Sequence, residues 1–323
     1  MPKVESATFF IVGGAGFVGS NMVEELMKRG ARVVVYDNLS SGNYDFIKQY
    51  ESNKEFRFIK ADILDTKTLN DSIKESHPDT VIHLAANPDI RLSNIKTDLD
   101  LQQGTIGTYN VLEAMRLNDV KRFIFSSSSA VYGSIKVLPT PEDAGPLQPI
   151  SLYGASKLAC EGLVTAFSHL YGMDYYMFRF GNVIGKNLTH SVVIDLIAKL
   201  KKSGNKSMEV LGNGQQRKSF IEVSDIVNGI LYVYTNSTER ENLYNLTTDD
   251  QLSVKDIAEM IVDKLAKDAE IKYTGTTQGW PGDVVNAYLS NAKLKALGWK
   301  PTMSSREAMS KGIDLYAKRV YGS

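Results

Sequence analysis

The sequence predicts an α/β fold: a doubly wound parallel sheet, followed by a smaller C-terminal α/β region. Up to residue 180, short apolar runs alternate with amphipathic stretches, which is the order of successive strand–helix–strand units. The apolar runs are nearly continuous instead of alternating with polar residues, as is typical of parallel strands buried on both faces. Beyond about residue 185 this rhythm changes, which marks the second region.

The elements of the first region, residues 1–185, follow from this pattern. Strands are expected at 8–12, 32–37, 56–59, 80–85, 122–127 and 175–180. Helices are expected between them, at 17–29, 66–75, 97–117 and 152–171. Each helix is long enough to cross back over the sheet, so the strands are expected to be parallel.

The second region, residues 186–323, reads as helices at 190–202, 223–235 and 254–266 with short strands at 208–211 and 243–246. Ser253 is a plausible N-cap for the last of these helices. The stretch GNGQQ at 212–216 is typical of a loop. We expect this region to bind substrate and its segments to interleave with the first region.

The composition limits the possible functions. The 323 residues contain 37 basic and 37 acidic side chains, and this balance argues against a general nucleic-acid surface. Cys160 is the single cysteine and the four histidines show no ligand spacing, so no metal site or internal disulfide is expected. No apolar run approaches the roughly 20 residues that cross a bilayer, and we expect no membrane contact and a cytoplasmic location.

A glycine-rich turn opens the chain. Residues 7–19 read ATFFIVGGAGFVG, in which a strand is followed by closely spaced glycines and an amphipathic helix. Alone this pattern is weak, but its position between a strand and a helix is the context of a dinucleotide (Rossmann) fingerprint. Backbone N–H groups at the helix start can hold a pyrophosphate. We predict cofactor contacts from Gly13, Gly16, Phe17, Val18 and Gly19.

An acidic residue ends the next strand. Asp37, in RVVVYDN, lies 18 residues after Gly19, where a carboxylate can bind both ribose hydroxyls and repel a 2′-phosphate, so NAD is favoured over NADP. Asn38 and Leu39 follow it. Asp62 and Ile63, after the third strand, are expected near the adenine, although Asp62 can instead be a simple helix N-cap.

The segment SLYGASK, residues 151–157, places Tyr153 and Lys157 one helical turn apart. The pair can be ordinary surface neighbours or an acid–base device. A free phenol has a pKa near ~10 and is a poor base at neutral pH. A nearby ammonium, together with the positive nicotinamide, stabilises the phenolate and lowers that pKa. Tyr153 would then accept a proton from a hydroxyl group. The strand ending in FIFSSSS supplies serines at the edge where ligands bind.

With these motifs in order, the chain resembles the extended short-chain dehydrogenase/reductases, in the branch of NAD-dependent nucleotide-sugar epimerases. It is most similar to UDP-glucose (UDP-galactose) 4-epimerases. The resemblance runs from about residue 7 to Trp299. It rests on GGAGFVGS, YDNLSSG, ADILD, HLAAN, SSSSAVYG, YGASK, RFGNVIG and SNAKLKALGW.

The resemblance implies site residues. The catalytic hydroxyl four residues before Tyr132 is Ser128, which would bridge Tyr153 and the substrate oxygen. Tyr153 would contact both the substrate and the cofactor, and Lys157 would also hold the nicotinamide ribose. HLAAN implies cofactor contacts from Leu84, Ala85 and Ala86. For the substrate, the resemblance implies Asn182 and Lys218 near the diphosphate, Arg217 beside them, and Val193 near the uracil and sugar.

Three positions depart from the family pattern. An arginine that often precedes the late Gly-Asp is replaced by Trp280, which would stack on a base or simply pack. Gly104 replaces an asparagine that braces the active-site strand, which implies a structural difference. Ala287 falls where a bulky residue covers the sugar's 2-substituent, so we expect UDP-GlcNAc and UDP-GalNAc to be tolerated beside UDP-glucose and UDP-galactose.

Ser128 is followed by Ser129 and Ala130, without the Asp-Glu pair of the related dehydratases, which favours reversible oxidation and reduction at C4. A nucleotide-sugar decarboxylase or another oxidoreductase of this superfamily remains an alternative, and a non-catalytic NAD-sensing protein is a remote one. The resemblance also implies a homodimer formed by the helices at 97–117 and 152–171.

Overall fold

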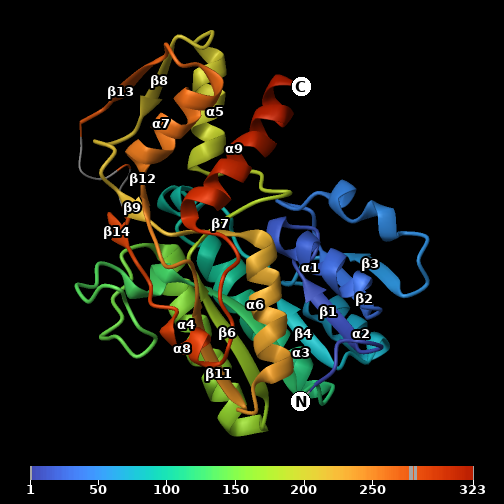
Figure 1. The fold of residues 1–323 in the computed structure, drawn as a ribbon. Coiled ribbons are helices and arrows are strands. Elements are labelled where there is room, and N and C mark those ends of the chain that lie inside the picture. The colour runs from blue at the N-terminus through green and yellow to red at the C-terminus, as the bar shows by residue number, and fades with distance from the viewer. Residues whose placement is uncertain (1, 276–278, 280–281, 323) are drawn as a thin grey trace.

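A parallel sheet forms the centre of the computed structural model, which describes residues 2–275, 279 and 282–322 (Figure 1). Its seven strands lie in the order β11-β6-β5-β4-β1-β2-β3. They are β1 (Thr8–Val12), β2 (Arg32–Asp37), β3 (Phe56–Lys60), β4 (Thr80–His83), β5 (Arg122–Ser128), β6 (Asp174–Phe180) and β11 (Glu241–Leu246). The order reverses at β1, between β2 and β4, so the predicted doubly wound Rossmann-type sheet is confirmed.

Helices cover both faces of this sheet. On one face lie α2 (Thr66–Ser76), α3 (Gly107–Leu117) and α4 (Leu152–Tyr171), and on the other α1 (Phe17–Lys28) and α6 (Val223–Asn236). Phe9 and Ile11 of β1 pack into the core with α1 and α6, whereas Phe10 and Val12 pack into the core with α2, α3 and α4. Alternate residues thus face different cores, which explains the continuous apolar run of this strand.

The helix expected over 97–117 is only partly regular. Its first part, Asp100–Ile106, is a π-helix, and the regular helix α3 begins at Gly107. The π-helical segment packs closely on α4, because a Cβ atom at Gly104 would lie 2.2 Å from the Ser156 hydroxyl oxygen. That hydroxyl donates to the carbonyl oxygen of Asp100 at 2.7 Å. Gly104 therefore permits close helix packing.

The second region forms its own core, seen at the top of Figure 1. Its elements are α5 (Val192–Lys202), α7 (Val254–Leu265), α9 (Ser305–Tyr321), and the parallel pair β8 (Ser207–Val210) and β13 (Glu270–Tyr273). Ser253 caps α7 as predicted, in a capping box with Asp256.

Several segments cross between the two regions. The strand expected at 243–246 begins at Glu241 and joins the large sheet, where all six residues of β11 pair with β6. Small strands connect the regions: β7 (Asn182–Ile184) with β10 (Phe220–Glu222), and β9 (Arg217–Lys218) with β12 (Leu252–Ser253) and β14 (Asn286–Ala287). The short helices are η1 (Tyr44–Phe46), η2 (Lys48–Tyr50), η3 (Ile90–Asn94), η5 (Ser129–Tyr132) and α8 (Ala292–Ala296). Of the helices in the described ranges, none has the length and apolarity to cross a membrane.

Candidate active site

A cavity of about 1190 Å³ lies between the carboxyl ends of the sheet strands and the second region. Most of the residues predicted from the sequence line it. They are Gly13, Gly16, Phe17, Val18, Gly19, Asp37, Asn38, Ile63, Leu84, Ala85, Ala86, Ser128, Tyr153, Lys157, Asn182, Val193 and Lys218. Leu39, Asp62, Arg217 and Ala287 do not line it, and Trp280 lies outside the described residues. The fold thus gathers the glycine turn, the Tyr–Lys pair and Lys218 around one space.

The glycine turn forms one end of the cavity. Gly13 has φ +82°, and a Cβ atom there would lie 2.6 Å from the backbone nitrogen of Ala85. A Cβ atom at Gly19 would lie 2.1 Å from the carbonyl oxygen of Gly13. Both positions therefore require glycine. Helix α1 starts at Phe17 and no side chain caps its N-terminus, so its first N–H groups stay open to a ligand.

Asp37, at the end of β2, lies beside this turn. Its carboxylate accepts hydrogen bonds from the backbone N–H of Ala15 at 2.9 Å and of Leu39 at 2.8 Å. Burial raises the pKa of the carboxyl group, and these two hydrogen bonds act in the opposite direction. Leu39 has φ +60°. It does not line the cavity, but its backbone N–H group donates to the Asp37 carboxylate and so helps to hold it in place.

Asp62 lies behind the cavity wall. Its carboxylate accepts from the side-chain amide of Asn38 at 2.7 Å and from the backbone N–H of Leu64 at 2.9 Å. The next residue, Ile63, does line the cavity. Asp62 thus braces the loop after β2 through Asn38, and its carboxylate is engaged before any ligand arrives.

These features fit a nicotinamide adenine dinucleotide. An uncapped helix N-terminus behind a glycine turn accommodates a pyrophosphate, and a carboxylate at the end of β2 suits a ribose diol and disfavours a 2′-phosphate. When bound, the dinucleotide supplies a reversible hydride acceptor. Gly13, Gly19 and Asp37 would hold its adenosine and phosphate parts, and Lys157 its nicotinamide ribose.

Ser128, Tyr153 and Lys157 meet at the centre of the cavity. Ser128 is the last residue of β5 and Tyr153 lies in the first turn of α4, whose N-cap Ser151 accepts from the backbone N–H of Gly154 at 3.1 Å. A side-chain hydrogen bond joins the Ser128 hydroxyl and the Tyr153 phenol. Lys157, 4% exposed, donates to the carbonyl oxygen of Ser126 at 2.7 Å.

Burial dominates the electrostatics of this group. Burial raises the pKa of the Tyr153 phenol to about 12, against the lowering effect of the hydrogen bond with Ser128. Burial also lowers the pKa of the Lys157 ammonium. The ammonium lies 5.8 Å from the centroid of the Tyr153 ring and 4.8 Å from that of Phe125. In the chain alone, burial thus outweighs the hydrogen bond with Ser128. The predicted lowering requires the positive nicotinamide together with the Lys157 ammonium, and it stays a prediction for the enzyme with its cofactor.

A buried ion pair supports the catalytic helix from behind. Arg179 of β6 and Glu161 of α4 are joined by two hydrogen bonds of 2.9 and 2.7 Å. Ser127, the neighbour of Ser128, donates to the same carboxylate at 2.5 Å. Arg179 also donates to the phenol oxygen of Tyr132 at 2.8 Å. Since Glu161 lies one turn after Lys157, this network fixes α4 against the end of β5.

His83 lies beneath the site at the end of β4. It is fully buried beside the stacked rings of Phe123 and Phe125, and its Nε2 atom is 3.0 Å from the Thr108 hydroxyl oxygen. Burial lowers its pKa to about 3, and the charge of Lys157 adds to this effect. The imidazole therefore stays neutral throughout the physiological range.

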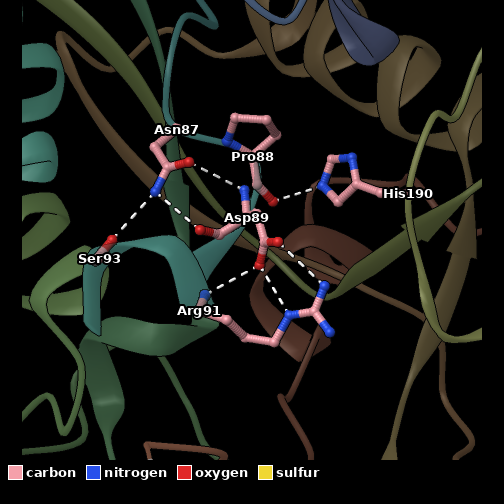
Figure 2. Close-up of polar contacts among 6 residues, drawn as sticks. All are labelled: Asn87, Pro88, Asp89, Arg91, Ser93 and His190. Atoms are coloured by element: carbon pink, nitrogen blue, oxygen red, sulfur yellow. Dashed lines mark hydrogen bonds and ion pairs between the residues drawn. The ribbon is translucent and has the colours of Figure 1, made fainter. Parts of the chain in front are cut away.

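The loop after β4 is part of the cavity wall that sequence reasoning missed (Figure 2). Asn87 is buried, and its amide nitrogen donates to the Asp89 carbonyl at 3.0 Å and the Ser93 hydroxyl at 3.1 Å. Arg91 makes two side-chain hydrogen bonds to the Asp89 carboxylate. The Nε2 atom of His190, from the second region, lies 2.5 Å from the carbonyl oxygen of Pro88. The motif HLAAN contains Asn87, and this was the available signal.

The substrate side of the cavity is formed by β7, α5 and β9. Lys218 donates to the carboxylate of Asp283 at 2.6 Å, and Asn182 donates to the carbonyl oxygen of Ser219 at 3.3 Å. Val193 is buried in the wall from α5. Arg217 is exposed on the opposite side of β9 from Lys218, and Ala287 is the β14 partner of Lys218. The alternation of side chains along β9 explains why Lys218 faces the cavity and Arg217 does not.

Within the described residues, no group of three or more histidine, cysteine, aspartate or glutamate side chains is arranged to hold a metal ion. A serine–tyrosine–lysine group beside a dinucleotide-binding turn defines a class of enzyme that moves a hydride and a proton at a hydroxyl-bearing carbon.

Comparison with known proteins agrees with this class. Residues 9–247 match the model of the NAD dependent epimerase/dehydratase family. A putative UDP-glucose 4-epimerase of Methanocaldococcus jannaschii is 32% identical over 94% of this chain and 96% of its own. A crystal structure of a UDP-galactose 4-epimerase superposes with a TM-score of 0.86 at 36% identity, over 97% of this chain and 99% of that one. A UDP-N-acetylglucosamine 4-epimerase of Methanobrevibacter ruminantium, in complex with UDP-N-acetylmuramic acid, gives 0.86 at 26%, over 98% and 99%.

The chain therefore belongs to the NAD-dependent epimerase/dehydratase family. It is an enzyme of the nucleotide-sugar 4-epimerase type, and the predicted cofactor, NAD, is confirmed.

Proposed function

We propose that the enzyme interconverts the C4 epimers of a UDP-sugar, most readily UDP-glucose and UDP-galactose. The observation that carries this proposal is that Ser128 and Tyr153 share one cavity with the glycine turn, at one end, and with Lys218, at the other. A sugar hydroxyl at Tyr153 would then lie between a hydride acceptor and a diphosphate anchor. UDP-sugars appear in the names of the related enzymes, which supports this choice of substrate.

Each catalytic side chain has a distinct task. Tyr153 accepts the proton of the C4 hydroxyl while hydride leaves the same carbon, and it returns that proton when hydride comes back to the opposite face of the 4-keto sugar. Ser128 bridges the phenol and the sugar oxygen. Lys157 provides positive charge beside the developing phenolate and is held in place by the Ser126 carbonyl. Rotation of the keto sugar requires a loosely held hexose and a firmly held diphosphate.

A dehydratase reaction is disfavoured by the residues after Ser128. Loss of water from the sugar requires an acid beside the neighbouring hydroxyl, and the positions that follow Ser128 are Ser129 and Ala130. Reversible oxidation and reduction at C4 requires no such acid, so epimerisation accounts for the side chains present at this point of the chain.

Lys218 is proposed as the main cationic contact of the diphosphate, with Asn182 beside it. The ion pair with Asp283 holds the Lys218 ammonium at the cavity wall and compensates part of its charge. A lysine also contacts phosphate without the fixed two-pronged geometry of arginine. We extend the proposal to UDP-GlcNAc and UDP-GalNAc, which the relative named for N-acetylglucosamine supports.

We propose a homodimer through α3 and α4, in the cytoplasm. These helices expose apolar and aromatic side chains, among them Tyr109 (43% exposed) and Leu170 (71% exposed). Tyr109 packs edge-on against Phe167, and Phe167 against Tyr171, so an aromatic surface spans both helices. Covering such a surface with a second copy removes apolar area from water.

The function is tested by incubating the purified protein with UDP-glucose, and separately with UDP-GlcNAc, without added oxidant. Proton NMR should show the C4 epimer appearing until the two sugars reach equilibrium, with no net consumption of NAD⁺. No change at C4 in any common UDP-sugar would contradict the proposal. Stoichiometric loss of NAD⁺ would instead indicate a net oxidation or decarboxylation.

A further inference from the structure

Gln216 is a buried side chain whose polar atoms are unused within the structure. It is 2% exposed, and among the residues that the structure describes, neither its amide nitrogen nor its amide oxygen has a hydrogen-bond partner. An unpaired amide in the interior destabilises a protein, because its hydrogen bonds to water are lost on folding and not replaced. Gln216 is also part of the cavity wall, so a ligand is the partner that can complete it.

The position of Gln216 along the chain assigns it to one end of the substrate. Phe220 pairs with Asn182 across β10 and β7, and Phe180 is level with Ser128 in the large sheet, so this part of the segment lies toward the catalytic centre. Lys218 precedes Phe220 by two residues, and Gln216 precedes Lys218 by two more. Four residues of extended chain span roughly 13 Å, which leaves room for the sugar and the diphosphate. Gln216 therefore lies beyond the diphosphate contact, at the nucleoside.

The surroundings of Gln216 suit a flat ring that has apolar faces and polar atoms along its edge. Val210, Leu211, Leu252 and Val254 line the same cavity and provide apolar walls. Gly279 lies beside the amide. A Cβ atom built on Gly279 would lie 3.7 Å from the Gln216 amide nitrogen, 3.4 Å from the Asp283 carboxylate and 3.8 Å from the carbonyl oxygen of Leu211. A ligand that reaches Gln216 would therefore meet both apolar walls and polar atoms.

We propose that Gln216 is a specificity-determining residue whose side-chain amide reads the nucleobase of the substrate, accepting from the ring N3–H and donating to the adjoining carbonyl of uracil. This inference rests on the proposed function and adds the contact that selects the nucleotide. A primary amide pairs with such an N–H/C=O edge through two hydrogen bonds. Thymine presents the same edge, with a methyl group at C5 as the only difference in the ring.

The test compares UMP with 3-methyl-UMP, in which a methyl group replaces the N3 hydrogen, by isothermal titration calorimetry on the NAD-loaded enzyme. The wild-type enzyme should bind UMP about 10- to 100-fold more tightly than 3-methyl-UMP. In Gln216→Met this ratio should fall to nearly 1. Ribose 5-phosphate, which has no base, should bind both proteins equally. A parallel titration with 5-methyl-UMP shows whether the site prefers uracil or thymine.

The neighbouring Gln215 offers a matched control, because it is exposed. Gln215→Met should keep the wild-type ratio. Thermal unfolding without nucleotide should show that Gln216→Met melts no lower than the wild type, since the replacement removes a buried unpaired amide. If that variant fails to fold, Gln216→Asn, which withdraws the amide by one methylene, should also lose most of the discrimination.

An unchanged ratio in Gln216→Met, or a wild-type enzyme that binds UMP and 3-methyl-UMP equally, would overturn the assignment while leaving the epimerase function intact. A parallel loss of ribose 5-phosphate binding and thermal stability would show that Gln216 is structural, which also overturns it. If the wild-type enzyme binds neither UMP nor 5-methyl-UMP, the nucleotide-sugar substrate itself is wrong and this inference fails with it.

Discussion

Lys157 donates its ammonium hydrogen bond, 2.7 Å long, to the main-chain carbonyl oxygen of Ser126, two residues before Ser128. The catalytic helix and the serine-bearing strand are thus joined at the point where the chemistry takes place. Through this bond the ammonium keeps a fixed position beside Tyr153, whose phenol remains protonated in the chain alone because burial raises its pKa to about 12. The positive charge of the bound, oxidised cofactor is then needed to favour the phenolate.

Replacing Tyr153 by phenylalanine should remove the base and leave the rest of the site in place. We expect kcat to fall by about 10²- to 10⁴-fold, the usual contribution of a general acid–base group. Cofactor affinity should change much less than kcat, since the glycine turn and Asp37 supply most of the predicted cofactor contacts. NMR turnover assays and NAD titration measure the two effects separately. A Tyr153→Phe enzyme that retains more than a tenth of its activity would assign the base to another residue.

Asp37 should set the preference between NAD and NADP. Asp37→Asn keeps an acceptor for only one of the two backbone N–H groups, those of Ala15 and Leu39, because they donate to different carboxylate oxygens. The variant also removes the charge that repels a 2′-phosphate. We expect the NAD to NADP affinity ratio to fall by about 10-fold, measured by titration of each dinucleotide. Asp45→Asn, at an exposed position on the following loop, serves as the control. An unchanged ratio in Asp37→Asn would place the discriminating group elsewhere.

His83 should make the protein sensitive to mild acid. Its pKa is lowered to about 3 in the fold, against about 6.5 when unfolded. Between pH 3 and pH 6.5, the His83 imidazole is protonated in the unfolded chain and neutral in the folded chain. The contribution of the neutral His83 to the free energy of unfolding is therefore complete above pH 6.5, and it decreases as the pH falls below that value. Between pH 7 and 5, the free energy of unfolding should fall by about 2 kcal/mol more in the wild type than in His83→Asn.

Chemical denaturation at each pH measures this difference. His77 is an exposed residue with φ +42°, a conformation that asparagine accepts readily, so His77→Asn is a suitable control and should follow the wild type. If His83→Asn and the wild type lose stability in parallel, His83 is not the group that responds to acid.

The proposed dimer depends on the aromatic surface of α3 and α4. Tyr109→Glu places a charge within it, and burying an unpaired carboxylate at an interface is unfavourable. Analytical ultracentrifugation should show a dimer for the wild type and a monomer for this variant. Leu315→Glu, at a comparably exposed position of α9, should leave the dimer intact. Dimers in both variants would locate the interface elsewhere.

The sequence predicted the sheet and the cofactor end because the signals there are local. A glycine turn between a strand and a helix, or an acid at a strand end, can be recognised from a few neighbouring residues. The role of Asp62 was less predictable, since its carboxylate accepts a hydrogen bond from Asn38, which is distant in sequence. The π-helical segment before α3 also depends on a distant residue, because Gly104 packs against Ser156 of α4.

The substrate side was predicted least well, for the same reason. Whether Arg217 or its neighbours face the cavity depends on the pairing of β9 with β12 and β14, which come from remote parts of the chain. The resemblance pointed to Arg217 and Lys218 together, but alternation along a strand admits only one of two adjacent residues. Gln216, on the same side as Lys218, became visible only through its burial and its unpaired amide.

The central claim is that hydride leaves C4 of the sugar and returns to the same carbon of the same molecule. UDP-glucose carrying deuterium at C4 tests it most directly. Mass spectrometry and NMR of the UDP-galactose formed should show that the deuterium is retained at C4, with none lost to solvent. Product that forms with hydrogen at C4, or deuterium released into water, would contradict the account, because the label would then have left as a proton instead of a hydride.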